Sequence, residues 1–423
     1  MKRKDKFRNV YYVLFALFIG VIVYSLLTPD DAPIIPLPVV NDTPKDLFTT
    51  SFDSGSLGSW VEVSPLNYDL MFREDYPGCS AKQDVYDQCT SWMMFRYRGV
   101  KGSDVSFTFK NFNYASGSYW NGANARAYVS CNIDDQNSWV PIGTKTLSSN
   151  PGTTVTKSIK LTMTLPCDNP YIASFIPYQV SFRDKVVNEL KSNKNVKVDI
   201  IGQSRLSVNN NIYRVTITNP SVNDINKKII VVNSGLHSSE TYGDFIAEGM
   251  VRAAMKDDEW LKKYIIYWYP VSNPVGRFKG YGRYDDLGND PNRVWKNNKN
   301  PEVKIVKDNI IALVDPNRIV LGVDSHGNGG GGSTSYAMTC ASTTYANNLK
   351  TYSVFKDITG GRCPSSGAPN PSSLGDTGAS FYNAYFPKAI GYTSEHVQYP
   401  ANSYSNLMMQ GDGWFKAIKA TWN

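Results

Sequence analysis

The chain has 423 residues, 41% of them hydrophobic, so it is long enough for two or three domains and has the composition of a globular protein. Its 44 basic residues exceed its 37 acidic residues only slightly, and much of the excess lies in the first eight residues. Because no basic stripe interleaved with aromatic residues follows, the sequence argues against a nucleic-acid-binding function.

The N-terminal segment predicts a membrane anchor. Residues 1–9 form a basic tail, and residues 10–27 follow as 18 residues without a charge, which is enough to cross a bilayer. Because the basic residues precede the apolar segment, the tail is expected in the cytosol and everything after Leu27 outside it. The alternative is a cleaved signal peptide, which would give a secreted protein.

Residues 28–46 carry five prolines and predict a stiff, extended linker. The rest of the chain contains an even number of cysteines: Cys79, Cys89, Cys131, Cys167, Cys340 and Cys363. In an exported domain these six residues permit three disulfides, whose pairing stays open. If the anchor prediction were wrong, buried free thiols would be the expectation instead. No CxxC motif occurs, so a cysteine zinc site is not expected.

Residues 47–168 alternate between short runs of aromatic or β-branched residues and turns rich in Gly, Asn, Asp and Ser. Examples of such runs are SWMMFRYRGV, SDVSFTFKNFNY and TKSIKLTMTLP. No segment of helical periodicity interrupts them. This pattern predicts an antiparallel β-sandwich domain of about seven or eight strands.

The pattern changes in residues 169–423. A helix is predicted in YQVSFRDKVVNELKSN, and strands are predicted in KVDIIGQS, YRVTITNP and KKIIVVNSG. An amphipathic helix in SETYGDFIAEGMVRAAMKD and two apolar strands in YIIYWYPVSNP and RIVLGVDSHG follow. Because strands and helices alternate, this segment predicts an α/β domain with a mixed, largely parallel sheet and flanking helices.

Histidine is rare in this chain, and two of its three histidines directly follow predicted strands. These are His237 and His326, and Glu240 comes three residues after the first of them. In open α/β sheets, sites usually lie at the carboxyl ends of strands. Two imidazoles and one carboxylate can hold a catalytic zinc ion and leave a fourth position for water. An HxxE pair alone is weak evidence, since a turn histidine with a chance glutamate is more common.

Six elements in a fixed order make the zinc hypothesis more specific. They are HSSE, NPVG, Arg283, DPNR, DSHG and YTSE, which span His237 to Glu395. In this order they resemble the zinc metallocarboxypeptidases, and most closely the cytosolic-carboxypeptidase (Nna-like) branch. That branch also carries a β-sandwich ahead of its catalytic domain, which begins much as FDSGSLGSWVEVSPLNYDLMFRED does here. The resemblance covers roughly residues 50–423.

The resemblance implies a role for each element. One Zn²⁺ ion would be held by His237, Glu240 and His326. Glu395 would be the general base for a zinc-activated water, and Arg283 would stabilise the negative charge of the transition state. Asp290 would accept a hydrogen bond from the first ligand histidine and so fix its tautomer. His396 is expected to be structural, because the ligand set is complete without it.

The substrate would be recognised by its free C-terminal carboxylate. Asn292 and Arg293 match the family's carboxylate clamp, and a planar guanidinium is the best single partner for a carboxylate. Phe381 is expected to form an apolar wall of the specificity pocket. The segment 377–387 has no Lys or Arg, whereas members that trim glutamate have a basic residue in this neighbourhood. A preference for neutral C-terminal residues is therefore expected.

We therefore expect a membrane-anchored, outward-facing zinc metallocarboxypeptidase that removes C-terminal amino acids from peptides or proteins. Its partners would be substrate C-termini and, through residues 10–27, a membrane. One alternative is a deglutamylase or a hydrolase of side-chain amides that uses the same site. An alternative of another class is a catalytically silent carboxypeptidase-like binding protein.

Overall fold

The computed structural model describes residues 47–79, 89–110, 127–142, 144–149, 156–313, 315–328, 337–339, 376–386, 388–397 and 403–422. The predicted tail, anchor and linker in residues 1–46 lie outside this part of the chain. Within the described ranges, no helix is both long and apolar enough to cross a membrane.

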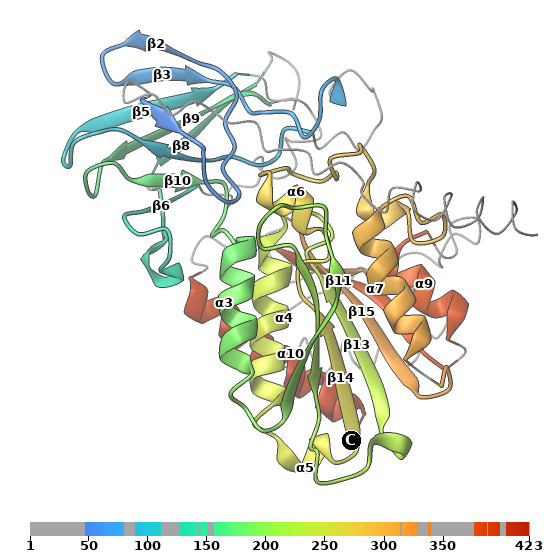
Figure 1. Cartoon of the computed structure of the whole chain (residues 1–423). Helices are drawn as coiled ribbons and strands as arrows, with labels where there is room; N and C mark the ends of the chain where they lie inside the picture. The colour runs from blue at the N-terminus through green and yellow to red at the C-terminus, as the bar shows by residue number, and fades with distance from the viewer. Residues whose placement is uncertain are drawn as a thin grey trace, which may run out of the picture.

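The first domain is a β-sandwich of two five-stranded sheets (Figure 1). One sheet has the order β1-β4-β10-β6-β7, and the other has the order β2-β3-β5-β9-β8. Their strands are β1 (Phe48–Thr49), β2 (Trp60–Ser64), β3 (Asn67–Leu70), β4 (Met94–Tyr97), β5 (Asp104–Phe109), β6 (Tyr128–Ser130), β7 (Val140–Pro141), β8 (Thr144–Ser149), β9 (Thr156–Thr164) and β10 (Tyr171–Ala173). A short 3₁₀ helix, η2 (Gln136–Ser138), precedes β7.

The sandwich differs in two ways from the sequence-based expectation. The described residues hold ten strands rather than seven or eight, because several strands of two or three residues are too short to show an alternating pattern. The pairing of β3 with β5 is parallel, whereas all other strand pairs of the two sheets are antiparallel in the described part. The sheet also extends past residue 168, because β10 pairs with both β4 and β6.

Aromatic rings fill the space between the two sheets. The ring centroid of Phe48 lies 5.3 Å from those of Tyr68 and Tyr97, and Phe107 lies 5.2 Å from Tyr97. Two disulfides stabilise this domain, and they join Cys79 to Cys89 and Cys131 to Cys167. The other two cysteines lie outside the described residues.

The second domain is built on a mixed seven-stranded sheet of order β11-β12-β14-β13-β15-β17-β16. Its strands are β11 (Val196–Gln203), β12 (Asn211–Ile217), β13 (Lys228–Ser234), β14 (Tyr264–Tyr269), β15 (Ile319–Asn328), β16 (Ala337–Thr339) and β17 (Ile390–Val397). The four central strands are parallel, and the strands on both edges pair in antiparallel fashion. The prediction of an α/β domain with a mixed sheet is confirmed.

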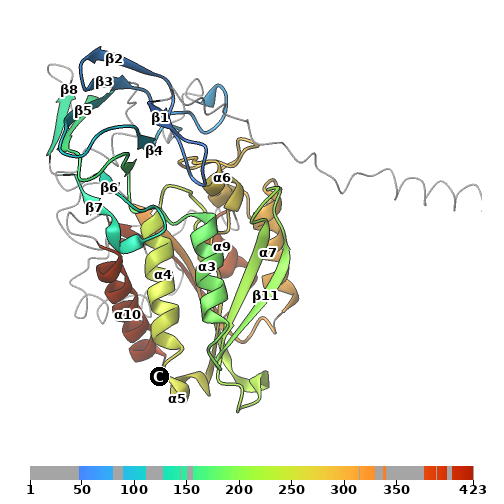
Figure 2. The same ribbon diagram turned by 60° about the vertical axis from the view of Figure 1, so that its left-hand side comes forward.

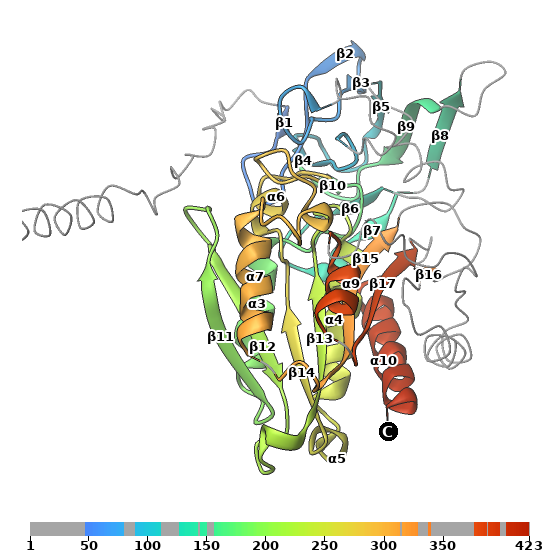
Figure 3. The same ribbon diagram turned by 90° about the vertical axis from the view of Figure 1, so that its right-hand side faces the viewer.

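Helices cover both faces of this sheet (Figures 1 and 3). One face carries α3 (Val180–Leu190), α4 (Thr241–Ala254) and α10 (Tyr404–Thr421), and the other carries α7 (Pro301–Ala312) and α9 (Gly378–Tyr385). Shorter helices are η3 (Asp224–Asn226), α5 (Asp258–Leu261), α6 (Pro274–Phe278) and η4 (Pro291–Arg293). Because both faces are covered, β13 is apolar on both sides: Ile230 and Val232 pack on one face, and Ile229 and Val231 on the other.

The sandwich lies over the end of the α/β domain at which α3 and α4 begin (Figure 2). The Thr241 hydroxyl at the start of α4 donates to the carbonyl of Ile176 at 2.7 Å. At the next residue, the Tyr242 and Tyr128 hydroxyls are 3.2 Å apart, which joins α4 to strand β6 of the sandwich. The carboxyl ends of the parallel strands therefore lie at the boundary between the two domains.

Candidate functional site

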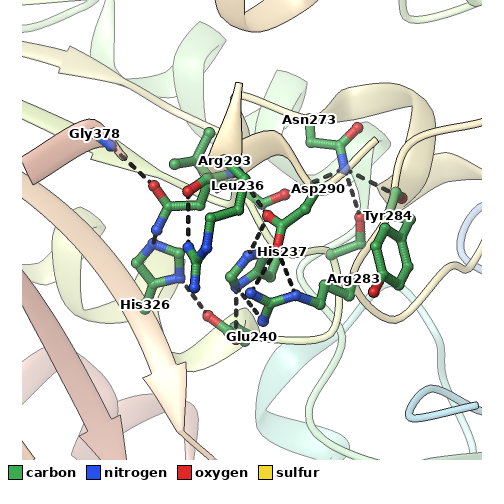
Figure 4. Close-up of polar contacts among 12 residues, drawn as sticks. Leu236, His237, Glu240, Asn273, Arg283, Tyr284, Asp290, Arg293, His326 and Gly378 are labelled. Atoms are coloured by element: carbon green, nitrogen blue, oxygen red, sulfur yellow. Dashed lines mark hydrogen bonds and ion pairs between the residues drawn. The ribbon is translucent and has the colours of Figure 1, made fainter. Parts of the chain in front are cut away.

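The loop that follows β13 carries His237 at the carboxyl end of the parallel sheet. Asn273, which precedes α6, holds this loop on both sides of the histidine (Figure 4). Its Nδ2 donates to the Leu236 carbonyl at 3.2 Å and to the Ser238 hydroxyl at 3.3 Å. The NPVG element thus has a structural task that the sequence did not reveal, which is to fix the position of the histidine loop.

Glu240 immediately precedes α4, yet its side chain does not cap the helix. Its two oxygens face the two histidines instead. Oε1 lies 2.9 Å from His237 Nδ1, and Oε2 lies 2.6 Å from His326 Nδ1. Close packing of α4 on β15 makes this possible, because a Cβ atom at Gly243 would lie only 2.7 Å from the Ser325 carbonyl oxygen.

The three predicted metal ligands are brought together in one buried cluster. The ligand atoms of His237, Glu240 and His326 all lie within 4.8 Å of one another. Burial alone would raise the pKa of the Glu240 carboxyl, but the adjacent His237 and His326 rings hold it well below its usual range. Two imidazole nitrogens and one ionised carboxylate that face a common point fit a zinc ion.

A carboxylate lies behind each histidine ring. Asp290 Oδ1 lies 3.1 Å from His237 Nε2, and Asp324 Oδ2 lies 2.9 Å from His326 Nε2. A proton on His237 Nε2 therefore has an acceptor, which leaves the Nδ1 lone pair of this ring free for a metal, and the Asp324 carboxylate lies within ion-pair distance of His326 Nε2. The predicted contact between Asp290 and His237 is present.

Asp324 was not singled out from the sequence, although a signal for it exists. It lies two residues before His326 on β15, and residues two apart on a strand point to the same face of a sheet. Asn292 also approaches this ring, since its Nδ2 is 3.0 Å from His326 Nε2 while its Oδ1 accepts from the backbone N–H of Gly378. Asn292 therefore lies between His326 and the start of α9.

The two predicted arginines differ in their surroundings. Arg283 is buried, and its Nε donates to Asp290 Oδ2 at 2.7 Å while its Nη1 lies 3.5 Å from His237 Nδ1. Burial would raise the pKa of the Asp290 carboxyl, but Arg283 and His237 hold it far below its usual range. Arg293 is exposed, and its Nη1 donates to the Asn292 carbonyl at 2.8 Å (Figure 4). Arg293 is therefore accessible to an anionic ligand.

Glu395 lies in β17 and pairs in register with His326 on the neighbouring strand β15. This backbone position is at the same end of the sheet as the three predicted metal ligands. The described part of the structure does not include the Glu395 side chain. Its role as general base therefore stays a prediction.

Phe381 does not lie where the sequence suggested. It is fully buried in the hydrophobic cluster under α9, with its ring centroid 5.1 Å from that of Trp295 and 5.6 Å from that of Phe386. A side chain without exposed surface cannot contact a substrate, so this placement does not support a pocket wall at Phe381. The next residue, Tyr382, is also buried, and its hydroxyl accepts from Asn233 at 2.8 Å.

His396 is buried beside Trp414, with the ring centroids 5.5 Å apart. Burial lowers the pKa of His396 to about 3, so the ring is neutral at physiological pH. It does not belong to the cluster of three potential ligands found in the described residues. This position agrees with the structural role expected for it.

Comparisons with known proteins agree with this arrangement. Residues 185–360 match the family model described as zinc carboxypeptidase. The chain is similar to cytosolic carboxypeptidase 6 of Caenorhabditis elegans (26% identical over 302 residues, 66% of this chain and 62% of the relative). It is also similar to human cytosolic carboxypeptidase 2 (24% identical over 316 residues, 69% of this chain and 34% of the relative). The aligned segments thus cover less than two thirds of either relative's length.

Solved structures share the fold. A metallo-carboxypeptidase from Burkholderia cenocepacia has a TM-score of 0.71 at 18% identity, covering 89% of this chain and 98% of the other. A metallo-carboxypeptidase from Pseudomonas aeruginosa, solved with (2-guanidinoethylmercapto)succinic acid, has a TM-score of 0.70 at 16% identity, covering 88% and 98%. Because these coverages include most of this chain, the similarity extends over both domains.

Proposed function

We propose that this protein is a zinc-dependent carboxypeptidase that removes C-terminal amino acids from peptides or proteins, because residues 185–360 match the zinc carboxypeptidase family model. The observation that carries the proposal is the buried cluster of His237, Glu240 and His326 with a carboxylate behind each histidine ring. An accessible guanidinium nearby, that of Arg293, supports a substrate with a free carboxylate.

Each group at the site has a separate task in this proposal. A zinc ion at the three ligands would polarise the scissile carbonyl and lower the pKa of a bound water. Glu395 would take a proton from the attacking water and pass it to the leaving amine. Arg283 would stabilise negative charge on the carbonyl oxygen, because Asp290 holds its guanidinium beside His237. Arg293 and Asn292 would bind the C-terminal carboxylate.

The proposal is tested with purified, zinc-loaded protein and a matched pair of peptides. The two peptides have the same sequence, but one has a free C-terminal carboxylate and the other a C-terminal amide. Release of the last residue from the free acid, and little release from the amide, is the expected result. If zinc is bound stoichiometrically and neither peptide is hydrolysed, the silent binding protein is the better description.

A panel of peptides that differ only in the last residue tests specificity. We expect neutral or apolar residues to be released on the order of tens of times faster than glutamate, because an acidic side chain needs a cation in its pocket. Lys388 does not supply this cation, because it lies at the opposite end of the sheet from the site. It comes just before Ile390, which pairs with Leu321 near the start of β15, whereas Glu395 pairs with His326 near the end of β15. Fastest release of glutamate would point to a cation from residues 344–373, outside the described part, and to the deglutamylase alternative.

We also propose that residues 10–27 anchor the protein and that the catalytic domain faces an oxidising compartment. The disulfides Cys79–Cys89 and Cys131–Cys167 support this location, because disulfides are rare in the cytosol. In intact cells, externally added protease is expected to degrade the catalytic domain. The four cysteines should also resist alkylation until they are reduced. A protected domain with four reactive thiols would contradict the proposal and would favour the cytosolic location that the relatives' names indicate.

A further inference from the structure

A carboxylate of the sandwich domain binds the backbone of the loop that carries Arg283. Asp75, which is 2% exposed, accepts three backbone hydrogen bonds from consecutive residues of the α/β domain. Its Oδ1 accepts from Gly282 N–H at 2.6 Å, and its Oδ2 accepts from Arg283 N–H at 2.7 Å and from Tyr284 N–H at 2.9 Å. These three N–H donors favour the ionised carboxylate, although burial raises the pKa of Asp75 to about 7, and together they fix this stretch of backbone.

The same sandwich segment also binds the start of this loop. Arg73 Nη2 donates to the carbonyl oxygens of Lys279 and Gly280. Gly280 has a φ of 66° and packs on the sandwich so closely that a Cβ atom there would lie 2.6 Å from the Gly55 carbonyl oxygen. Arg73 therefore binds loop carbonyls while Asp75 binds loop N–H groups, so the sandwich determines the course of residues 279–284.

Asp75 itself is held in place by the sandwich. Its backbone N–H donates to the Cys89 carbonyl at 3.0 Å, and Cys89 is joined to Cys79 by a disulfide. The adjacent Tyr76 ring packs edge-on against Tyr284, with the ring centroids 5.5 Å apart. The carboxylate is thus presented from a cross-linked segment and has little freedom to follow the loop if the loop moves.

The loop leads directly into the metal cluster. The backbone N–H of Ser239, between the two predicted ligands His237 and Glu240, donates to the Gly282 carbonyl at 2.8 Å. The side chain of Arg283, whose backbone N–H is bound by Asp75, donates from Nε to Asp290 Oδ2 at 2.7 Å. A shift of this backbone would therefore move the Arg283 guanidinium relative to the site, and displacements near 1 Å are enough to impair catalysis.

We propose that Asp75 is a positioning residue of the active site, which makes the sandwich domain a structural part of the catalytic centre rather than a separate binding module. This inference rests on the proposed function, because the task of Asp75 is to hold Arg283 where it can act on a substrate. Among the described residues, Asp75 has no hydrogen bond to His237, Glu240 or His326, and it acts through the backbone N–H groups of residues 282–284.

The test compares Asp75→Asn with the matched control Asp69→Asn. Asp69 is in the same domain, is 33% exposed and pairs with Lys110 at 3.4 Å. Asp75→Asn should lower kcat by about 10- to 100-fold with little change in KM and with zinc still bound. Amide hydrogen exchange in residues 282–284 should become at least about tenfold faster. Asp69→Asn should change neither kcat nor the exchange rate of residues 282–284. An unchanged exchange rate in Asp75→Asn would overturn the inference.

A double-mutant cycle distinguishes positioning from general damage to the fold. If Asp75 acts through Arg283, Asp75→Asn should have almost no further effect on kcat in an Arg283→Ala background. The same fold-loss in both backgrounds would overturn the inference. If Asp75→Asn does not fold, Asp75→Ser, which keeps one acceptor oxygen, takes its place. Amide exchange needs no substrate, so it tests Asp75 even if the zinc-loaded protein hydrolyses no peptide and the proposed function fails.

Discussion

Replacement of Glu395 by Gln is expected to lower kcat by about 10²-fold or more while the zinc content stays that of the unaltered protein. Glutamine has nearly the same shape as glutamate, but its amide cannot take a proton from water at neutral pH. The position of Glu395 supports this role, because β17 pairs it in register with His326 at the edge of the sheet where the ligands meet. Single-turnover assays together with metal analysis check the prediction.

A matched control for this change is Glu259→Gln. Glu259 has a side chain that is 82% exposed and pairs with Lys262 at 2.6 Å on the surface. Its replacement should leave kcat and zinc content unchanged, because exposed ion pairs contribute little. Near-normal turnover by zinc-loaded Glu395→Gln would mean that another residue is the base.

The sequence predicted the metal cluster because its signals are local. His237 and His326 each follow an apolar strand, and parallel strands bring their carboxyl ends to one edge of a sheet. Asp324 also has a local signal, because it lies two residues before His326 and so points to the same face of β15. This spacing becomes informative only when the His326 ring is known to need an acidic partner. Such partners could be found from sequence by a search for acidic residues two positions from a ligand.

Contacts between distant segments could not be predicted in this way. Asp75 binds residues more than 200 positions away, and no spacing or periodicity of the sequence relates it to Arg283. Phe381 was expected in the pocket because of its position before Glu395. The face it presents depends on how α9 packs, and that packing buries it beside Trp295. The sequence analysis predicted neither α9 nor the rotation of this helix about its own axis.

Replacement of His326 by Ala is expected to remove nearly all zinc and all measurable activity. Only His237 and Glu240 would remain as ligands, and two ligands do not make a stable zinc site. The change also leaves the buried carboxylates of Glu240 and Asp324 without the ring that now lies between them, at 2.6 and 2.9 Å. A buried carboxylate that loses its hydrogen-bonding partner costs about 1–3 kcal/mol, so the variant should also melt at a lower temperature.

Two further variants separate loss of a ligand from loss of stability. His396→Ala removes a buried histidine that is not one of the three predicted ligands, so it should lower the melting temperature but keep stoichiometric zinc. Asp324→Asn keeps all three ligands and removes only the negative charge beside His326 Nε2, so zinc should bind about 10- to 100-fold more weakly. Zinc is measured on folded protein after dialysis against a competing chelator. Full zinc in folded His326→Ala would show that this histidine is not a ligand. Equal zinc loss in His396→Ala would show that reduced stability, and not the loss of a ligand, explains the loss of zinc.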